Sequence, residues 1–267
     1  MPLAYINETS LNYQFDGPDQ GSVVMLSNSL ASDLTMWDTQ VPALVEAGYR
    51  VLRYDSRGHG QSAVPKGPYS IELLTSDAVG LMDAFGLEKV HFCGLSKGGM
   101  VGQLLGAKHG DRLISLTLCD TSAYMAPREI WDERIEAVRK NGMDAVADAT
   151  IDRWFTKAGQ ERLHAEVEKI RQVILNTPVD GYCACCAAIR DMDQRESIRT
   201  ISTPVLVMVG EHDPSTPVLA SELIHERIAS SELRIISNAA HFVNVEQASV
   251  FNNALLEFID TAEQSET

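Results

Sequence analysis

The sequence KVHFCGLSKGGM, residues 89–100, joins a short apolar run to a serine set among glycines. Residues 94–98 fit the pattern G-x-S-x-G, with Ser96 at its centre. The apolar run predicts a buried strand, and glycines at every fourth position from Gly98 to Gly106 share one face of a following helix. Glycines suit a sharp strand-to-helix turn because neighbouring Cβ atoms have no room there. The pattern therefore predicts that Ser96 is an exposed nucleophile at such a turn.

Length and charge limit the kinds of protein this chain can be. The chain has 267 residues, of which 45% are hydrophobic, and this suits one large globular α/β domain. Its formal net charge of −15 repels phosphate backbones and anionic membranes, so we expect no nucleic-acid or membrane partner. The N-terminus lacks the basic and apolar segments of a signal peptide, and we therefore expect a cytoplasmic protein. No oligomeric state is predicted.

The five cysteines predict reduced thiols and no metal centre. The count is odd, and Cys93 and Cys119 fall in predicted buried strands, which favours the cytoplasm over an oxidising compartment. The cluster at residues 183–186 lies in a run of small residues without a nearby histidine to complete a tetrahedral site. We interpret these cysteines as small apolar packing residues.

Apolar, β-branched runs alternate with helix-length segments along most of the chain. Such strands predict a mainly parallel sheet covered by helices on both faces. An antiparallel hairpin is expected at the N-terminal edge, formed by Leu3–Ile6 and Leu11–Phe15. The other predicted strands are Val23–Ser27, Arg50–Tyr54, Lys89–Cys93, Leu113–Leu118, Val205–Val209 and Leu233–Ile236, with helices over Trp37–Ala47, Ile71–Phe85 and Lys97–His109.

The alternation stops between residues 122 and 195. This stretch reads as helices only, over Arg128–Lys140, Ala145–Phe155, Arg162–Leu175 and Pro178–Arg190. A helical insertion between two sheet strands predicts a cap over the carboxyl edge of the sheet, where open α/β folds bind ligands. The expected organisation is a core domain of residues 1–121 and 196–267 with a cap of residues 122–195.

A nucleophilic serine needs a base and an acid that orients it. In this kind of fold the order along the chain is serine, acid, histidine, with the last two on loops after late strands. Asp213 and His241 follow two predicted strands in that order, so we predict a triad of Ser96, Asp213 and His241. Asp120 also follows a predicted strand and is a competing acid, with Glu211 a further alternative.

Acyl transfer also needs hydrogen-bond donors for the developing oxyanion. The backbone N–H of Lys97, the residue after the nucleophile, is the first predicted donor. The second is the N–H of Leu30, on the loop after the strand Val23–Ser27.

Several motifs together resemble one known family. The stretches LSNSLASDLTMWDTQ, RVLRYDSRGHGQS, GLSKGGM, RWFT, GYCACCAAIRDMD, GEHDPSTP and AAHFVNVEQ are similar to those of the 3-oxoadipate enol-lactonases, which are α/β-hydrolases of aromatic catabolism in the β-ketoadipate pathway. The resemblance covers nearly the whole chain. It implies the α/β-hydrolase fold, no cofactor, opening of an enol-lactone to 3-oxoadipate, and Ser96, Asp213 and His241 as the triad.

The resemblance also raises the question of what binds the substrate. Family members usually have methionine where this chain has Lys97, whose side chain either meets a substrate carboxylate or reaches solvent. Arg190 and Arg153 are the rival carboxylate partners. Trp154 either lines the pocket or fixes the cap to the core. The alternatives to enol-lactone hydrolysis are a general carboxylesterase, a cofactor-free perhydrolase or haloperoxidase, and a ligand sensor without turnover.

Overall fold

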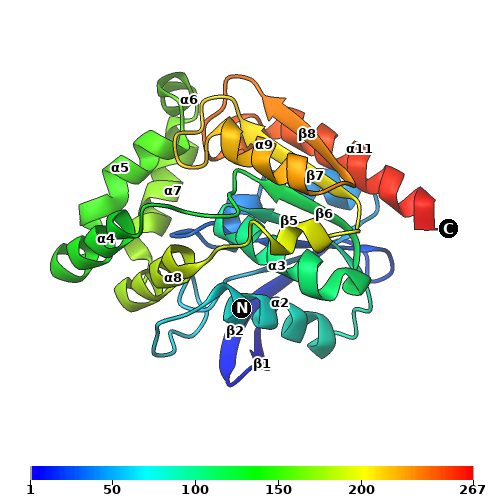
Figure 1. Ribbon diagram of the computed structural model, residues 1–267, viewed down its shortest axis with the longest axis horizontal. Helices are drawn as coiled ribbons and strands as arrows, with labels where there is room; N and C mark the ends of the chain where they lie inside the picture. The colour runs from blue at the N-terminus through cyan, green and yellow to red at the C-terminus, as the bar shows by residue number, and fades with distance from the viewer. Residues whose placement is uncertain (1, 267) are drawn as a thin grey trace.

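The computed structural model describes residues 2–266, and an eight-stranded sheet forms its centre (Figure 1). The strand order is β1-β2-β4-β3-β5-β6-β7-β8. The strands are β1 (Leu3–Ile6), β2 (Thr9–Asp16), β3 (Val23–Ser27), β4 (Arg50–Tyr54), β5 (Val90–Leu95), β6 (Leu113–Cys119), β7 (Val205–Gly210) and β8 (Ser231–Ile236). Every predicted strand is therefore confirmed, with ends that shift by up to two residues.

The sheet is antiparallel only at its N-terminal edge. Strands β1 and β2 form the predicted hairpin, and β2 runs antiparallel to β4, while the remaining pairs are parallel. The hairpin turns through Asn7 and Glu8, whose φ angles are 46° and 59°. Two successive positive φ angles give the turn a twist that matches the twist of the strands.

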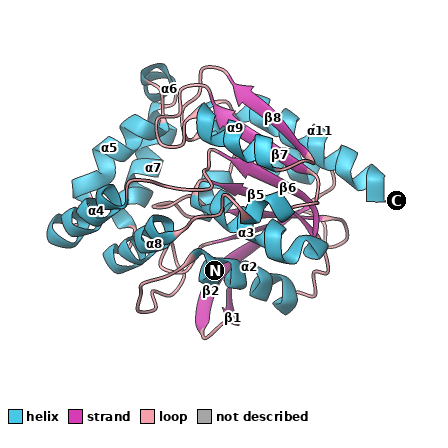
Figure 2. Ribbon diagram, in the orientation of Figure 1, coloured by secondary structure: helices cyan, strands magenta, loops and turns pink. Residues whose placement is uncertain are grey.

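Helices cover both faces of the sheet (Figure 2). Helices α1 (Val41–Glu46) and α11 (Ala248–Glu266) pack together on one face. Helices α2 (Ile71–Ala84), α3 (Lys97–His109) and α9 (Val218–Arg227) cover the other face. The predicted helix Trp37–Ala47 is wrong as one element. The chain forms a short 3₁₀ helix, Leu34–Trp37, and then begins α1 with a proline in its first turn, where the missing N–H costs no hydrogen bond.

Glycines bring α3 close to the sheet. A Cβ atom on Gly102 would lie 3.0 Å from side-chain atoms of Leu116 and Phe92. On Gly106 it would lie 2.9 Å from Leu116. The repeated glycines therefore form the face that contacts β5 and β6, as the sequence predicts.

Five helices between β6 and β7 form the cap at one end of the sheet (Figure 1). They are α4 (Arg128–Asn141), α5 (Asp144–Trp154), α6 (Lys157–Arg162), α7 (His164–Asn176) and α8 (Val179–Asp191). The helix predicted over Arg162–Leu175 is observed as α7, which begins two residues later than predicted. Helix α6 was not predicted. Thr156 begins α6, because its side chain accepts a hydrogen bond from the N–H of Gly159.

From the strand order, we expect a ligand site at the carboxyl ends of the central strands. Strand β3 lies between β4 and β5, so the chain leaves β3 towards one side of the sheet and later crosses to the other. Ligands of open α/β sheets bind at the carboxyl ends of strands where the order reverses in this way. The loops after β3 and β5 contain Leu30 and Ser96. Within residues 2–266, no helix is both long and apolar enough to span a membrane.

Candidate active site

Ser96 occupies a strained turn between β5 and α3. Its φ and ψ angles are 56° and −113°, a backbone conformation that non-glycine residues rarely adopt. The turn is held by a hydrogen bond from the Ser96 N–H to the carbonyl of Cys119 (2.9 Å) and by one from the Thr121 hydroxyl to the Ser96 carbonyl (2.8 Å). A Cβ atom on Gly98 would lie 2.1 Å from the carbonyl oxygen of Ser27. The glycine is therefore required, and the strain holds the serine side chain at the cavity described below.

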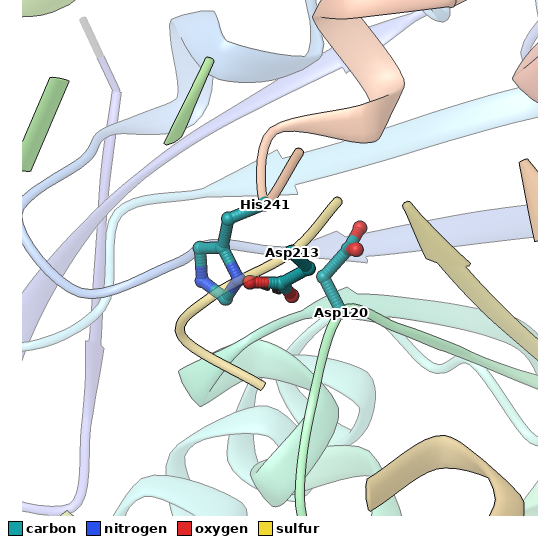
Figure 3. A group of neighbouring side chains, drawn as sticks. All are labelled: Asp120, Asp213 and His241. Atoms are coloured by element: carbon teal, nitrogen blue, oxygen red, sulfur yellow. Dashed lines mark hydrogen bonds and ion pairs between the residues drawn. The ribbon is translucent and has the colours of Figure 1, made fainter. Parts of the chain in front are cut away.

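His241 and Asp213 form a buried hydrogen-bonded pair, and their side chains point towards each other in Figure 3. The Nδ1–H of His241 donates to Oδ2 of Asp213 over 2.8 Å. The same carboxylate also accepts hydrogen bonds from the N–H groups of Ser215 and Thr216 and from the Thr216 hydroxyl (2.6 Å). Burial opposes ionisation, but the charge and hydrogen bond of His241 and the donors of Thr216 outweigh it and hold the pKa of Asp213 below its usual range. Asp213 is thus an ionised carboxylate that orients the imidazole.

Asp120, the competing acid, comes from the loop after β6 and does not hydrogen-bond to His241 (Figure 3). Its Oδ1 accepts from the N–H of Gly210 over 2.8 Å, and its Oδ2 has no hydrogen-bond partner among residues 2–266. Burial, followed by the negative charge of Asp213, raises the pKa of Asp120 well above its usual range. Asp120 is therefore favoured as the neutral acid. The geometry supports Asp213 as the orienting acid. Glu211 is half exposed, and its carboxylate accepts from the N–H of Asn238.

The same three side chains are the one group in the described chain whose spacing could suit a metal ion. One ligand atom from each of Asp120, Asp213 and His241 lies within 4.8 Å of the others. The donor chemistry does not fit a cation, because His241 presents an N–H to this group and Asp213 already accepts four hydrogen bonds. A neutral Asp120 is also a poor ligand. This arrangement suits orientation of the imidazole.

The loop after β3 presents the predicted second oxyanion donor. The N–H of Leu30 has no acceptor among the described residues, and Leu30 lines the same cavity as Ser96. The next residue, Ala31, has a φ of 56° and donates its N–H to Nε2 of His59 over 3.0 Å. Burial, and then the charge of Lys97, lower the pKa of His59 to about 3, so the ring stays neutral and can accept this bond. Lys97 begins α3, where the first N–H groups of a helix lack intrahelical acceptors.

The side chain of Lys97 lies inside the protein, away from this cavity. It is fully buried, and its Nζ donates to the hydroxyl of Ser56 over 2.6 Å. Burial lowers the pKa of Lys97, while the neighbouring Cys185 and Asp55 act in the opposite sense. Lys97 reaches neither solvent nor the cavity, so neither predicted position of its ammonium group is supported by the geometry. Of the groups of Lys97, only the backbone N–H stays a candidate oxyanion donor.

Two further predicted substrate contacts have different outcomes. Trp154 lines the cavity, and it also stacks on Phe242 with ring centroids 4.0 Å apart and planes inclined by 8°. The two alternatives for Trp154, lining the pocket or fixing the cap to the core, therefore both hold for this indole. Arg190 lies outside the cavity, where it pairs with Asp132 and Asp191. A contact between Arg190 and the substrate has no support from this geometry.

Glu246 connects the cap to the loop that contains His241, a role that the sequence did not reveal. Its buried carboxylate accepts hydrogen bonds from the N–H (3.0 Å) and hydroxyl of Thr156, in the cap, and from the N–H of Ala240 (2.8 Å). Its backbone carbonyl accepts from Arg162 over 2.6 Å. The loop that contains His241 and the cap are thereby fixed to one another.

One cavity of about 280 Å³ lies between the cap and the core. Ser96, His241 and Leu30 line it from the core, and Trp154 lines it from the cap. Two cap arginines, Arg134 and Arg153, also line it, and Arg134 was not predicted. Trp131, Thr150 and Ile189 are also among the lining residues. A cavity of this size suits a small ligand.

Comparison with known proteins identifies the family. Residues 22–248 match the sequence model of the family described as the alpha/beta hydrolase fold. A 3-oxoadipate enol-lactonase from Acinetobacter baylyi is 35% identical over 261 residues, which cover 96% of this chain and 97% of that protein. The crystal structure of an enol-lactonase from Burkholderia xenovorans is 41% identical, with a TM-score of 0.95 over 97% of this chain and all of that one (100%). A malate-bound thermophilic esterase from Thermogutta terrifontis is 32% identical, with a TM-score of 0.89 over 95% of this chain and 94% of that one.

Proposed function

This chain belongs to the α/β-hydrolase family, and from that membership we propose that it opens 3-oxoadipate enol-lactone through acyl transfer to Ser96. It is an enzyme that hydrolyses esters, with a small-molecule ester or lactone as its substrate. The observation that supports the proposal most is that Ser96 and His241 line the same small cavity and that Asp213 is hydrogen-bonded to His241. Enol-lactonases are similar to this chain over nearly its full length, and the proposed substrate is inferred from this similarity.

The first half of the reaction is acylation. His241 removes the proton from the Ser96 hydroxyl as the Oγ atom attacks the lactone carbonyl. Asp213 holds Nδ1–H of the ring and stabilises the imidazolium that forms. The N–H groups of Leu30 and Lys97 stabilise the oxyanion. Collapse of this intermediate breaks the ring C–O bond and releases an enolate, which takes up the proton held by His241 and becomes a ketone while the chain stays attached to Ser96. His241 is then neutral again.

The second half is deacylation. His241 removes a proton from water, which attacks the acyl carbonyl, and the same donors stabilise the second oxyanion. The ester bond to Ser96 breaks, the serine regains its proton from His241, and 3-oxoadipate leaves. No cofactor takes part in either half. We expect this reaction to serve aromatic catabolism in the cytoplasm, where the five free, buried cysteines of the described chain stay reduced.

The test of the proposed substrate is a comparison of kcat/KM for the enol-lactone with kcat/KM for 4-nitrophenyl acetate. We expect the enol-lactone to be preferred by about a hundredfold or more. An enzyme without substrate recognition would instead favour the activated aryl ester, so this preference would show that the lactone is recognised. A preference for the acetate, with the lactone opening only at its spontaneous rate, would identify a general carboxylesterase. Faster reaction with peroxide and a short carboxylic acid would identify a perhydrolase.

A further inference from the structure

The imidazole of His59 is bonded to the loop that contains Leu30, the predicted second oxyanion donor. Its Nε2 accepts the N–H of Ala31, the residue after Leu30, over 3.0 Å. We propose that His59 is a positioning residue for acyl transfer, which holds the Leu30 N–H at the place where the oxyanion forms. The inference rests on the proposed acyl transfer to Ser96, and it adds a side chain that does not itself line the cavity.

The backbone on either side of the Leu30 N–H is already bonded. The N–H of Ser29 donates to the sulphur of Met36 over 3.3 Å, and the N–H of Ala31 donates to the imidazole of His59. Within the described part of the chain, the N–H of Leu30 is the one of these three that has no acceptor. The loop is therefore fixed at both neighbouring residues, and the donor between them is left free for a ligand in the cavity.

Ala31 needs this support because its backbone is strained. Its φ angle is 56°, a conformation that a residue with a Cβ atom adopts only where surrounding contacts hold it. The bond to His59 joins the loop to a segment 28 residues further along the chain. Both residues are buried, so loss of the imidazole would leave an unpaired buried N–H. A shift of the loop would relieve that cost and would move the Leu30 N–H with it.

His59 is itself held rigidly. Its Nδ1 lies 3.4 Å from the carbonyl of Arg57, which accepts the proton of the tautomer whose Nε2 is free to accept. Arg57 forms two hydrogen bonds to the buried carboxylate of Asp77, of 2.5 Å and 2.6 Å. Between these residues, Gly58 lies against the cap, since a Cβ atom on it would be 2.6 Å from the Cα of Gly181 in α8. Core and cap together therefore fix the ring that holds the oxyanion loop.

The charges around His59 keep its ring in the accepting form. A protonated imidazole has an N–H on both nitrogens and cannot accept the N–H of Ala31. Burial, and then the positive charge of Lys97, lower the pKa of His59 to about 3. Arg57 adds a second positive charge nearby, and the thiol of Cys185 has its sulphur 3.9 Å from Nδ1. The buried ammonium of Lys97 thus supports the same bond from inside the protein.

His59→Phe removes the acceptor and keeps a flat ring. The Leu30 N–H acts on an oxyanion that is absent from the bound substrate, so its displacement should affect kcat more than KM. We expect kcat for 4-nitrophenyl acetate to fall by about tenfold or more, with KM within about threefold of wild type. The inhibition constant of phenyl trifluoromethyl ketone, which forms a tetrahedral adduct with serine, should rise by a similar factor. Titration of active sites with an organophosphate corrects each rate for the fraction of folded enzyme.

Three further variants separate the hydrogen bond from a general loss of structure. His59→Gln has a side-chain oxygen that reaches about as far as Nε2, so it should keep kcat within about threefold of wild type. His59→Asn is one bond shorter and should lose about as much as His59→Phe, and this comparison decides the matter if His59→Phe does not fold. His91→Phe is the matched control, because His91 is a buried histidine on β5 that does not line the cavity. Any loss of melting temperature there should leave kcat within about threefold of wild type.

Ala31→Gly tests whether His59 supports the strained backbone. Glycine adopts a positive φ angle without strain, so the loop then depends less on its bond to the imidazole. Added to His59→Phe, Ala31→Gly should recover about threefold or more of the lost kcat. Two unrelated packing changes would add their losses instead.

Two results would overturn the proposal. One is a His59→Phe enzyme whose kcat and inhibition constant both stay within about threefold of wild type. The other is an equal loss of kcat in His59→Phe and His59→Gln after correction for active sites. Failure of the proposed function gives a different pattern: the enol-lactone would not be opened, but hydrolysis of the acetate would still depend on His59. Normal opening of the enol-lactone by His59→Phe would leave the proposed function intact and refute this inference alone.

Discussion

The indole of Trp154 stacks on the ring of Phe242 at a centroid distance of 4.0 Å, and Phe242 directly follows His241 in the sequence. The N–H of Phe242 also donates to the carbonyl of Trp154 over 2.9 Å. The Trp154 and His241 rings have centroids 6.5 Å apart. The cap therefore packs directly against the loop that contains His241, so we expect cap stability and substrate binding to depend on the same side chain.

Trp154→Ala is expected to raise KM and to lower the melting temperature. The substitution removes a cavity wall and a buried stack, and replacing a buried tryptophan by alanine costs about 3 to 5 kcal/mol. Steady-state kinetics and thermal unfolding of the same preparation measure both effects. Trp154→Phe, which keeps an aromatic ring against Phe242, is the matched control and should lose less of each. An unaltered KM would limit Trp154 to fixing the cap, and an unaltered melting temperature would contradict the stacking role.

Asp213→Asn should abolish most activity, whereas Asp120→Asn should not. Of the two carboxylates, it is Asp213 that accepts the Nδ1–H of His241, and an amide there favours the wrong tautomer of the ring. We expect kcat for the ester substrates to fall by about a thousandfold or more in Asp213→Asn and by less than about tenfold in Asp120→Asn. The opposite ranking in the same assay would show that Asp120 is the orienting acid.

Asp120→Asn should also change how stability depends on pH. The raised pKa means that the folded protein keeps a proton on Asp120 that the unfolded chain releases above about pH 4. Stability from this group is therefore present at low pH and lost as pH rises, by about 1.4 kcal/mol per pH unit at most for one proton. Asparagine has no such proton, so the melting temperature of Asp120→Asn should rise relative to that of wild type as the pH increases above about 4. Asp213→Asn, which replaces a group with a lowered pKa, should show no such gain, and a parallel response of Asp120→Asn and wild type would contradict the buried neutral acid.

The parts of the site that the sequence predicts are those set by local chemistry. Ser96 is found from the glycines that its strained turn requires, and Gly98 does meet the backbone of Ser27 where a Cβ would lie. Asp213 and His241 follow parallel strands, and the carboxyl ends of such strands meet at one edge of the sheet. Their order along the chain was therefore enough to predict that they meet.

The parts that the sequence does not predict depend on how the cap sits on the core. Arg134, Arg153 and Arg190 are similar in sequence terms, and only the packing of α4, α5 and α8 decides which of them face the cavity. The direction of the Lys97 side chain also depends on a residue far away in the sequence, because its ammonium group donates a hydrogen bond to Ser56 on another loop. Glu246 gives no sequence signal, since its partners, Thr156 and Ala240, lie on different elements.

The most direct test of the account is the release of 3-oxoadipate from its enol-lactone by wild-type enzyme and by Ser96→Ala under the same conditions. We expect many turnovers per wild-type molecule. The variant should fold normally, since Ser96 contributes little packing, and its rate should fall by about ten-thousandfold or more. Turnover by the variant within about tenfold of wild type, or no wild-type turnover above spontaneous ring opening, would contradict the account.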